Sequence, residues 1–210
     1  MRKPTLGSLF AGIGGFDLGF ENAGWKTKWQ VEIKPELRDV LARHFPAAIR
    51  YGDIRTCTGQ RLGPVDCITA GFPCQDLSNA GKKFPRRGIT GERSGLFYEA
   101  MRIIREVRPA WVVLENVLGL LSCHDGEDFQ EVIKTLAASG YLGFWRVLNS
   151  RYFGVPQNRR RVFMVAGFGR YPSLELLADS SPVDPVSSPA RPLTISQDKV
   201  AEPTHTLLRS

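Results

Sequence analysis

The sequence is poor in the residues that build disulfide frameworks, metal centres and membrane spans. Its four cysteines, at positions 57, 67, 74 and 123, include no C-x-x-C pair, and its three histidines show no spacing suited to zinc. We therefore expect no metal, and free thiols in a reducing compartment. No apolar run approaches the length of a membrane span, and the first residues reach a glycine-rich stretch too early for a signal h-region. These absences predict an intracellular, cytoplasmic protein with no membrane partner.

Acidic residues are scarce in two segments of an otherwise ordinary composition. The chain carries a net charge of +7, with a pI of about 9.5. Residues 82–93 hold five basic side chains against Glu92 alone, and residues 146–170 hold six arginines and no acid. Either segment by itself is typical of a solvated basic loop. Together they favour a polyanionic partner such as nucleic acid.

Strand and helix patterns alternate along the chain, and no repeat is present. Helical stripes follow the glycine turn at 12–15 and recur at 35–45, 96–107 and 129–137. Apolar runs typical of strands cover residues 6–10, 28–31, 66–70, 111–114, 143–148 and 162–166. This order predicts an α/β fold, a mainly parallel sheet with helices on both faces. We expect one folded domain over residues 1–170, followed by a Pro/Ser-rich segment at 171–210.

The first candidate site is a glycine-rich turn between a strand and a helix. Such a turn lets backbone approach a ligand, and Glu32, 20 residues beyond Gly12, ends the second strand, where it can accept hydrogen bonds from ribose hydroxyls. A dinucleotide fingerprint needs a small residue where Asp17 stands, which disfavours a pyrophosphate and an oxidoreductase. A nucleoside without phosphates, such as S-adenosylmethionine, fits better, with Asp53 receiving an adenine amino group. A tightly packed turn and a surface acid remain the alternatives.

The second candidate site pairs a thiol with a carboxylic acid. Cys74 follows an apolar run and precedes a basic loop, and Glu115 ends the neighbouring run "WVVLE". Basic neighbours raise the thiolate fraction of a cysteine. A thiolate and an acid together can attack an electron-poor ring whose nitrogen must gain a proton. Each residue also has a simpler interpretation: Cys74 as a buried, inert thiol, and Glu115 as the partner of an arginine.

Taken in order, these motifs resemble the cytosine-C5 DNA methyltransferase family. The matching segments are "FAGIGGFDLGFENAG" (10–24), Glu32, "GDI" (52–54), "GFPCQDLS" (71–78), "RSGLFYE" (93–99), "ENV" (115–117) and "VPQNRRRVFMV" (155–165). The resemblance implies a Rossmann-like fold and transfer of a methyl group from S-adenosyl-L-methionine to C5 of a cytosine flipped out of double-stranded DNA. It also implies a setting in restriction–modification and a prokaryotic or phage source.

The resemblance assigns roles to individual residues. Cys74 would attack C6 of the cytosine while Glu115 acts on N3, Arg161 would contact O2, Arg159 would support the catalytic loop and carboxylate, and Gln157 opens the motif. The implied cofactor-binding residues are Phe10, Gly12, Gly14, Glu32, Ile33, Asp53, Ile54 and Pro73. The implied DNA-contacting loop includes Ser78, Lys82, Lys83, Arg86 and Arg87.

The match ends before the family's target-recognition region and its closing motifs. Residues 171–210 are therefore predicted to be a linker or the start of a truncated recognition region. Whether a second chain supplies the rest stays open at this point. Two further alternatives also stay open: a non-catalytic accessory module that binds DNA or a partner, and a methyltransferase that acts on RNA.

Overall fold

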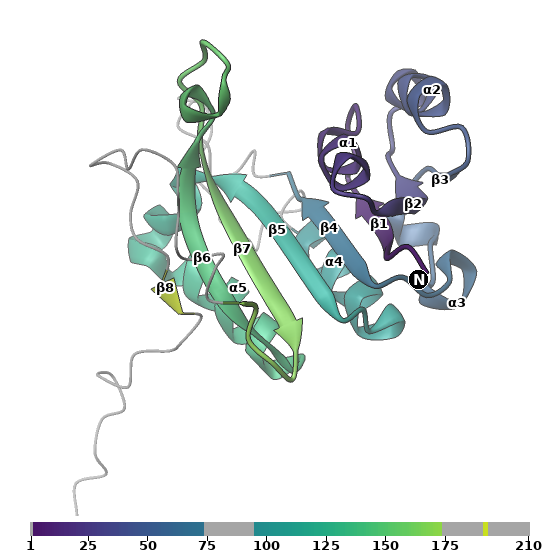
Figure 1. Cartoon of the computed structure of the whole chain (residues 1–210). Helices are drawn as coiled ribbons and strands as arrows, with labels where there is room; N and C mark the ends of the chain where they lie inside the picture. Colours follow the sequence, from purple (N-terminus) through teal and green to yellow (C-terminus); the bar gives the residue numbers. More distant parts are fainter. Residues whose placement is uncertain (1, 74–94, 174–190, 193–210) are drawn as a thin grey trace, which may run out of the picture.

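An eight-stranded sheet forms the centre of the molecule. The computed structural model describes residues 2–73, 95–173 and 191–192. The strands are β1 (Thr5–Leu9), β2 (Lys26–Val31), β3 (Ile49–Tyr51), β4 (Cys67–Gly71), β5 (Trp111–Val117), β6 (Tyr141–Asn149), β7 (Arg160–Phe168) and β8 (Arg191–Pro192). Their order across the sheet is β3-β2-β1-β4-β5-β7-β6-β8 (Figure 1). β1 to β5 pair in parallel, whereas β7 is antiparallel to both β5 and β6.

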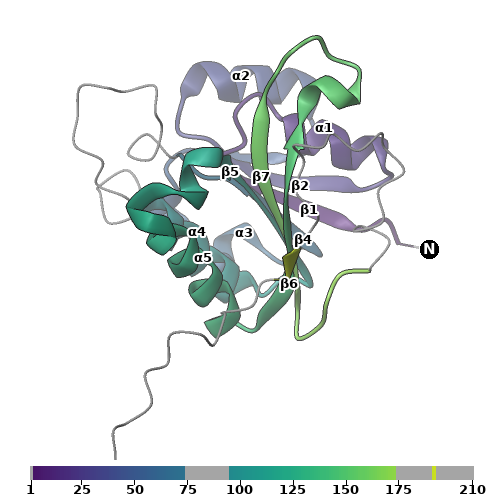
Figure 2. The same cartoon turned by 90° about the vertical axis from the view of Figure 1, so that its left-hand side faces the viewer.

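Helices cover both faces of this sheet. The α-helices are α1 (Gly15–Asn22), α2 (Pro35–His44), α3 (Gly59–Leu62), α4 (Gly95–Val107) and α5 (Glu127–Ala138), and short 3₁₀ turns lie at Ile54–Thr56, Leu118–Leu121, Cys123–Gly126 and Ser150–Phe153. α4 and α5 lie on one face and α1 on the other (Figure 2). The predicted α/β fold, mainly parallel with helices on both faces, is confirmed. None of the described helices is long and apolar enough to cross a bilayer.

The main core lies between the sheet and α4 and α5. The apolar stripe predicted for α4 is buried, with Phe97, Ile103 and Ile104 at 1% exposure or less. Pro109 follows two residues after the helix ends at Val107, as proline requires. A smaller cluster joins α2 to the turn before α1 through residues including Leu41.

The strand that carries the candidate acid is longer than predicted. The sequence pattern ends it at residue 114, whereas β5 continues to Val117. β5 is paired with β7 along the full length of β5. Hydrogen bonds of this ladder therefore hold the polar residues Glu115 and Asn116 in extended backbone. Glu115 therefore lies inside the strand rather than beyond its end, which corrects the sequence interpretation.

The sheet also includes a pair of residues from the proline-rich segment. Arg191 pairs with Trp145 and Pro192 with Phe144, both in β6. Proline lacks a donor, which suits it to an edge strand such as β8. The boundary at residue 170 stays a prediction.

Candidate active site

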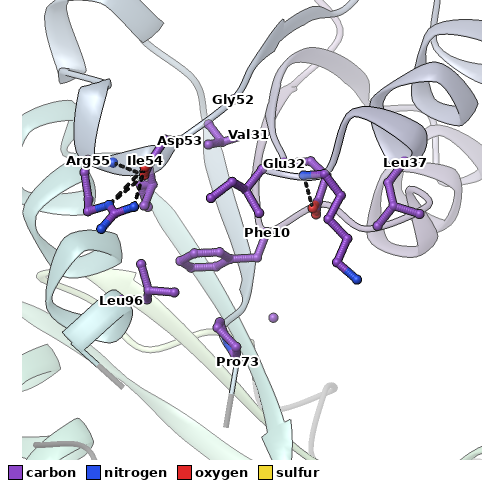
Figure 3. A pocket seen from close by; sticks show the side chains of 13 residues that line it. Phe10, Val31, Glu32, Leu37, Gly52, Asp53, Ile54, Arg55, Pro73 and Leu96 are labelled. Carbon is purple, nitrogen blue, oxygen red and sulfur yellow. Dashed lines mark hydrogen bonds and ion pairs between the residues drawn. The ribbon is translucent and has the colours of Figure 1, made fainter. Parts of the chain in front are cut away.

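The first cavity lies at the carboxyl edge of the parallel strands. It has a volume of about 610 Å³ and is lined by Phe10, Val31, Glu32, Ile33, Lys34, Leu37, Gly52, Asp53, Ile54, Arg55, Gly71, Pro73 and Leu96. Figure 3 shows Glu32 on one side, Asp53 on the opposite side and Phe10 between them. Two acceptors thus flank an apolar floor, an arrangement that suits a nucleoside with polar groups at both ends.

Glu32 is fixed in place by backbone groups. Its Oε2 accepts a hydrogen bond from the Gly12 amide at 2.9 Å, and its Oε1 accepts one from the Lys34 amide at 3.0 Å. Arg38 reinforces the loop by donating from Nη1 to the carbonyls of Glu32 and Ile33, at 2.8 and 2.7 Å. Because each carboxylate oxygen can accept about two hydrogen bonds, Glu32 keeps capacity for a ligand hydroxyl.

Asp53 is held by the residue two positions along the chain. Its Oδ1 accepts from the Arg55 amide and from Nε, both at 3.0 Å, and its Oδ2 accepts from Nη2 at 2.6 Å. The dashed lines in Figure 3 mark this pair. These hydrogen bonds, together with the guanidinium charge, hold the pKa of Asp53 below its ordinary value.

The turn before α1 needs unusual backbone angles. Gly12 has φ +60°, Gly14 has φ +88°, and Phe10, which lines the cavity, has φ +54°. A Cβ on Gly14 would lie 2.4 Å from the ring of Phe45. Gly14 therefore lets α1 pack against α2. A phenylalanine in the left-handed region beside a cavity is the kind of strain found at binding sites.

The second cavity lies over β5 and β7. It has a volume of about 330 Å³ and is lined by Glu115, Leu148, Ser150, Phe153, Arg159, Arg161 and Phe163. Glu115 and Arg161 form an ion pair, with Oε1 and Nε 3.1 Å apart. Val117 is the cross-strand partner of Arg161, and Glu115 lies two residues before it, so the paired side chains share a face of the sheet.

Burial changes the acidity of Glu115. Desolvation raises the pKa of Glu115 above its ordinary value, and the charges of Arg161 and Arg159 offset part of this rise. A carboxyl group with a raised pKa is a better proton donor near neutral pH than an exposed glutamate.

The two cavities meet at the end of β4. Gly71 lines the first cavity and pairs with Glu115, which lines the second. A Cβ on Gly71 would lie 3.4 Å from Oε2 of Glu115. Buried Asn116 donates from Nδ2 to the Phe72 carbonyl at 3.2 Å, which fixes the chain as it leaves the strand. Pro73, the last described residue of this segment, also lines the first cavity.

Comparison with known proteins decides the family. The model of the C-5 cytosine-specific DNA methylases matches residues 5–190. The chain belongs to this family. The expected resemblance is thereby confirmed, and membership of the C-5 cytosine-specific DNA methylases implies S-adenosyl-L-methionine as the cofactor.

Curated relatives support the same family. The chain is 36% identical to the type II methyltransferase M.NgoBV of Neisseria gonorrhoeae, over 87% of this chain and 45% of the relative. It is 39% identical to M.FnuDI of Fusobacterium nucleatum, over 75% of this chain and 45% of that protein. The chain thus spans about half the length of the curated relatives it matches.

Solved structures share the fold. A protein described as a DNA modification methyltransferase from an E. coli prophage has a TM-score of 0.68 at 22% identity, over 83% of this chain and 50% of the other. The Dnmt2 methyltransferase of S. pombe has a TM-score of 0.61 at 20% identity, over 81% and 51%.

The first cavity fits the cofactor of the methylase family. Fixed acceptors stand at both ends, and Phe10, Ile54 and Leu96 supply apolar surface for a flat base. Asp17, which stands where a dinucleotide fingerprint needs a small residue, is completely buried and accepts a hydrogen bond from Gln30 Nε2 at 3.0 Å, so its carboxyl group is directed into the interior of the fold.

The structure brings most of the described candidate residues into two groups. The first cavity contains Phe10, Glu32, Ile33, Asp53, Ile54 and Pro73, and the second contains Glu115, Arg159 and Arg161. Gly12 does not line the first cavity, but its backbone amide donates a hydrogen bond to Glu32, and Gly14 packs against α2. Gln157 is exposed, and its carbonyl accepts from Ser150 Oγ at 2.6 Å. Cys74, Ser78, Lys82, Lys83, Arg86 and Arg87 lie outside the described residues.

Sequence reasoning missed four residues of these sites. Arg38, Arg55 and Asn116 position the candidate carboxylates and the end of β4, and Phe163 lines the second cavity. Asn116 and Phe163 lie inside quoted motifs, which was the available signal. Nothing in the local pattern marks Arg38, since its contacts depend on how α2 packs beside β2.

One group of potential metal ligands lies away from both cavities. Nδ1 of His124 is 3.1 Å from Asp128 Oδ2 and 3.6 Å from Cys123 Sγ. The sequence spacing did not suggest this convergence, which depends on positive φ angles at His124 and Asp125. The geometry is that of a hydrogen-bonded pair between His124, in the 3₁₀ turn before α5, and Asp128, in the first turn of α5. The expected lack of a metal stays a prediction.

Proposed function

We propose that this chain provides the catalytic part of an enzyme that methylates C5 of cytosine in double-stranded DNA. One observation carries the proposal: a partly buried glutamate paired with an arginine lines a base-sized cavity, which adjoins a nucleoside-sized cavity at the end of β4. Family membership supports the reaction class. The substrate and the individual roles are our assignment, as is a location in the cytoplasm.

Glu115 and Arg161 are assigned to the cytosine ring. The raised pKa of Glu115 supports proton donation to N3, and the neighbouring guanidinium of Arg161 can donate to the O2 carbonyl. Arg159 adds positive charge to the same cavity and is assigned to support of the catalytic loop, and Gln157 holds the adjoining turn through its carbonyl. The pair polarises the ring along its N3–O2 edge, which makes C6 electrophilic.

Cys74 is assigned as the nucleophile. Its thiolate forms a bond to C6 while N3 gains a proton, and the electron pair released moves to C5. Bound S-adenosylmethionine supplies an electrophilic methyl group to that carbon. A base then removes the C5 proton, the electron pair left at C5 expels the thiolate, and N3 returns its proton to Glu115, which restores the ring as neutral 5-methylcytosine. The assignment is supported by its place in the sequence, directly after Pro73, which lines the first cavity, and within the motif "GFPCQDLS".

The first cavity is assigned to the cofactor. Glu32 would accept hydrogen bonds from ribose hydroxyls, and Asp53 would accept one from the adenine amino group. Phe10, Ile33 and Ile54 would contact the base, with Pro73 near the methionine end. Gly12 and Gly14 are assigned to the cofactor site because they form the turn beside it. The backbone amide of Gly12 also orients Glu32.

DNA contact is assigned to the two basic segments. The target carbon is inaccessible inside a duplex, so the base must be flipped out at a cost of roughly a few kcal/mol. We assign phosphate contacts to Ser78, Lys82, Lys83, Arg86 and Arg87, and to the arginines around the β6–β7 turn. Target recognition is assigned to the remaining length of the relatives, supplied by the same polypeptide or by a second chain.

Covalent trapping tests the proposal. The chain is incubated with S-adenosylmethionine and plasmid DNA in which 5-fluorocytosine replaces cytosine, because fluorine at C5 cannot leave as a proton. We expect a denaturant-resistant complex on gels that is abolished in Cys74→Ser and strongly reduced in Glu115→Gln. Cys123→Ser is the matched control, since Cys123 is a buried thiol away from both cavities, and it should trap normally.

The accessory interpretation remains the second candidate, because the chain spans 45% of its curated relatives. Binding of S-adenosylhomocysteine without any trapped complex would contradict catalysis by this chain and favour that interpretation. Trapping on fluorinated RNA but not on DNA would instead overturn the DNA assignment.

A further inference from the structure

We infer that Arg55 competes with the bound cofactor for the carboxylate of Asp53, and so sets how tightly the adenosyl group is held. The inference rests on the proposed cofactor site and adds a residue that limits affinity. Arg55 lines the same cavity as Asp53 and Glu32. Figure 3 shows its guanidinium folded back onto Asp53.

Arg55 uses most of the hydrogen-bonding capacity of Asp53. Oδ1 accepts from the backbone amide and Nε, and Oδ2 accepts from Nε at 3.0 Å and Nη2 at 2.6 Å. A carboxylate offers about four acceptor positions. An adenine amino group can therefore bind Asp53 fully only when the guanidinium gives up at least one contact.

The backbone around this pair is anchored independently. Arg102 of α4 donates from Nη2 to the Ile54 carbonyl at 3.1 Å and from Nη1 to the Cys57 carbonyl at 3.0 Å. The Arg55 side chain, in contrast, is 66% exposed. The guanidinium can move into solvent while the turn keeps its shape and the Arg55 amide keeps Asp53 oriented.

This arrangement gives Arg55 a role in the exchange of the spent cofactor for a new one. Methyl transfer converts the cofactor into S-adenosylhomocysteine, which must leave before the next turnover. A guanidinium that returns to Asp53 as the base departs lowers the affinity for both adenosyl ligands. The Arg55 guanidinium can also donate to an oxygen at the 6-position of the base, so it weakens discrimination between a 6-amino and a 6-oxo purine.

Calorimetry on the wild-type chain and on Arg55→Ala tests this role. Exposed ion pairs are weak, so at low salt we expect S-adenosylhomocysteine to bind the variant about two- to fivefold more tightly. The difference should shrink toward none at about 0.5 M salt, because screening weakens the competing ion pair. The 6-oxo analogue S-inosylhomocysteine should bind Arg55→Ala more weakly than wild type. A purely structural role for Arg55 would weaken both ligands alike.

Two backgrounds separate competition from other effects. In Asp53→Asn, the further change of Arg55 to alanine should leave S-adenosylhomocysteine affinity unchanged within error. Arg61→Ala is the matched control, because Arg61 packs over Tyr51 and does not line the cavity. Equal or weaker binding of S-adenosylhomocysteine by Arg55→Ala overturns the inference while leaving the proposed function intact. No binding by the wild-type chain removes the cofactor site and the inference with it.

Discussion

Asp17 is an ionisable group buried without full compensation. It is inaccessible to solvent, its Oδ1 accepts from Gln30, and its Oδ2 has no hydrogen-bond partner among the residues that the structure describes. Desolvation raises the pKa of Asp17 above the ordinary 3.8. At neutral pH an ionised Asp17 therefore costs the folded state free energy, and this cost falls as the pH falls.

Replacement of Asp17 by asparagine should stabilise the chain at pH 8. The gain is about 1.4 kcal/mol for each unit by which folding raises the Asp17 pKa, provided that the folded-state pKa stays below the working pH. The folded state binds the proton more tightly than the unfolded state. The advantage of Asp17→Asn therefore narrows as the pH falls through the folded-state pKa, and disappears near 3.8. Urea unfolding at several pH values measures it, with exposed Asp39→Asn as control. A gap that widens toward acid would refute this account.

Among the strands, the pairing of β6 with β7 requires the two backbones to approach closely at Gly143. A Cβ on Gly143 would lie 2.0 Å from the Val165 carbonyl oxygen and 2.6 Å from the Ala166 Cα. Both are backbone atoms of β7, so no rotamer change relieves the overlap. The same pair of strands carries Arg161 and the wall of the second cavity. Distortion here would reach Glu115 as well as the fold.

Gly143→Ala should lower the free energy of unfolding by about 1–3 kcal/mol or more, as overpacking does. Chemical denaturation followed by circular dichroism measures the loss. Gly19→Ala is the matched control, because a Cβ there meets nothing within 4 Å and α1 gains helix propensity, which should add up to about 1 kcal/mol. Wild-type stability in Gly143→Ala would show that β6 and β7 separate more easily than the register implies.

At the scale of the whole molecule, charge is distributed unevenly about the sheet. The arginines of the β6–β7 turn lie at the edge where the second cavity opens. Arg2, by contrast, is paired with Asp66 near the start of β4. A polyanion held near both cavities would release its own condensed cations where the arginines of the β6–β7 turn neutralise its phosphates, and Arg2 would not contribute.

DNA affinity should therefore fall steeply with salt. Fluorescence anisotropy on a labelled duplex should give a negative slope of log K against log salt, and Arg151→Ala should reduce that slope by about one. Arg151 is exposed in the β6–β7 turn. Arg2→Ala should leave the slope unchanged. A flat salt response of the wild-type chain would contradict the phosphate contacts assigned to the basic segments.

The sequence by itself determined the elements and the carboxylates of the first cavity. Apolar periodicity marks the buried face of α4, because a helix and a strand repeat at different intervals. Glu32 and Asp53 could be placed together because parallel strands end at one edge of a sheet.

Only the tertiary structure decided the rest. The antiparallel insertion of β7, the Glu115–Arg161 pair and the inward direction of Asp17 all depend on partners far apart in the chain. The Arg55–Asp53 ion pair joins residues close in sequence, yet its proposed effect on the cofactor follows only from the cavity that both residues line. Strand order and side-chain pairing are settled by packing between elements, and no local pattern encodes that packing.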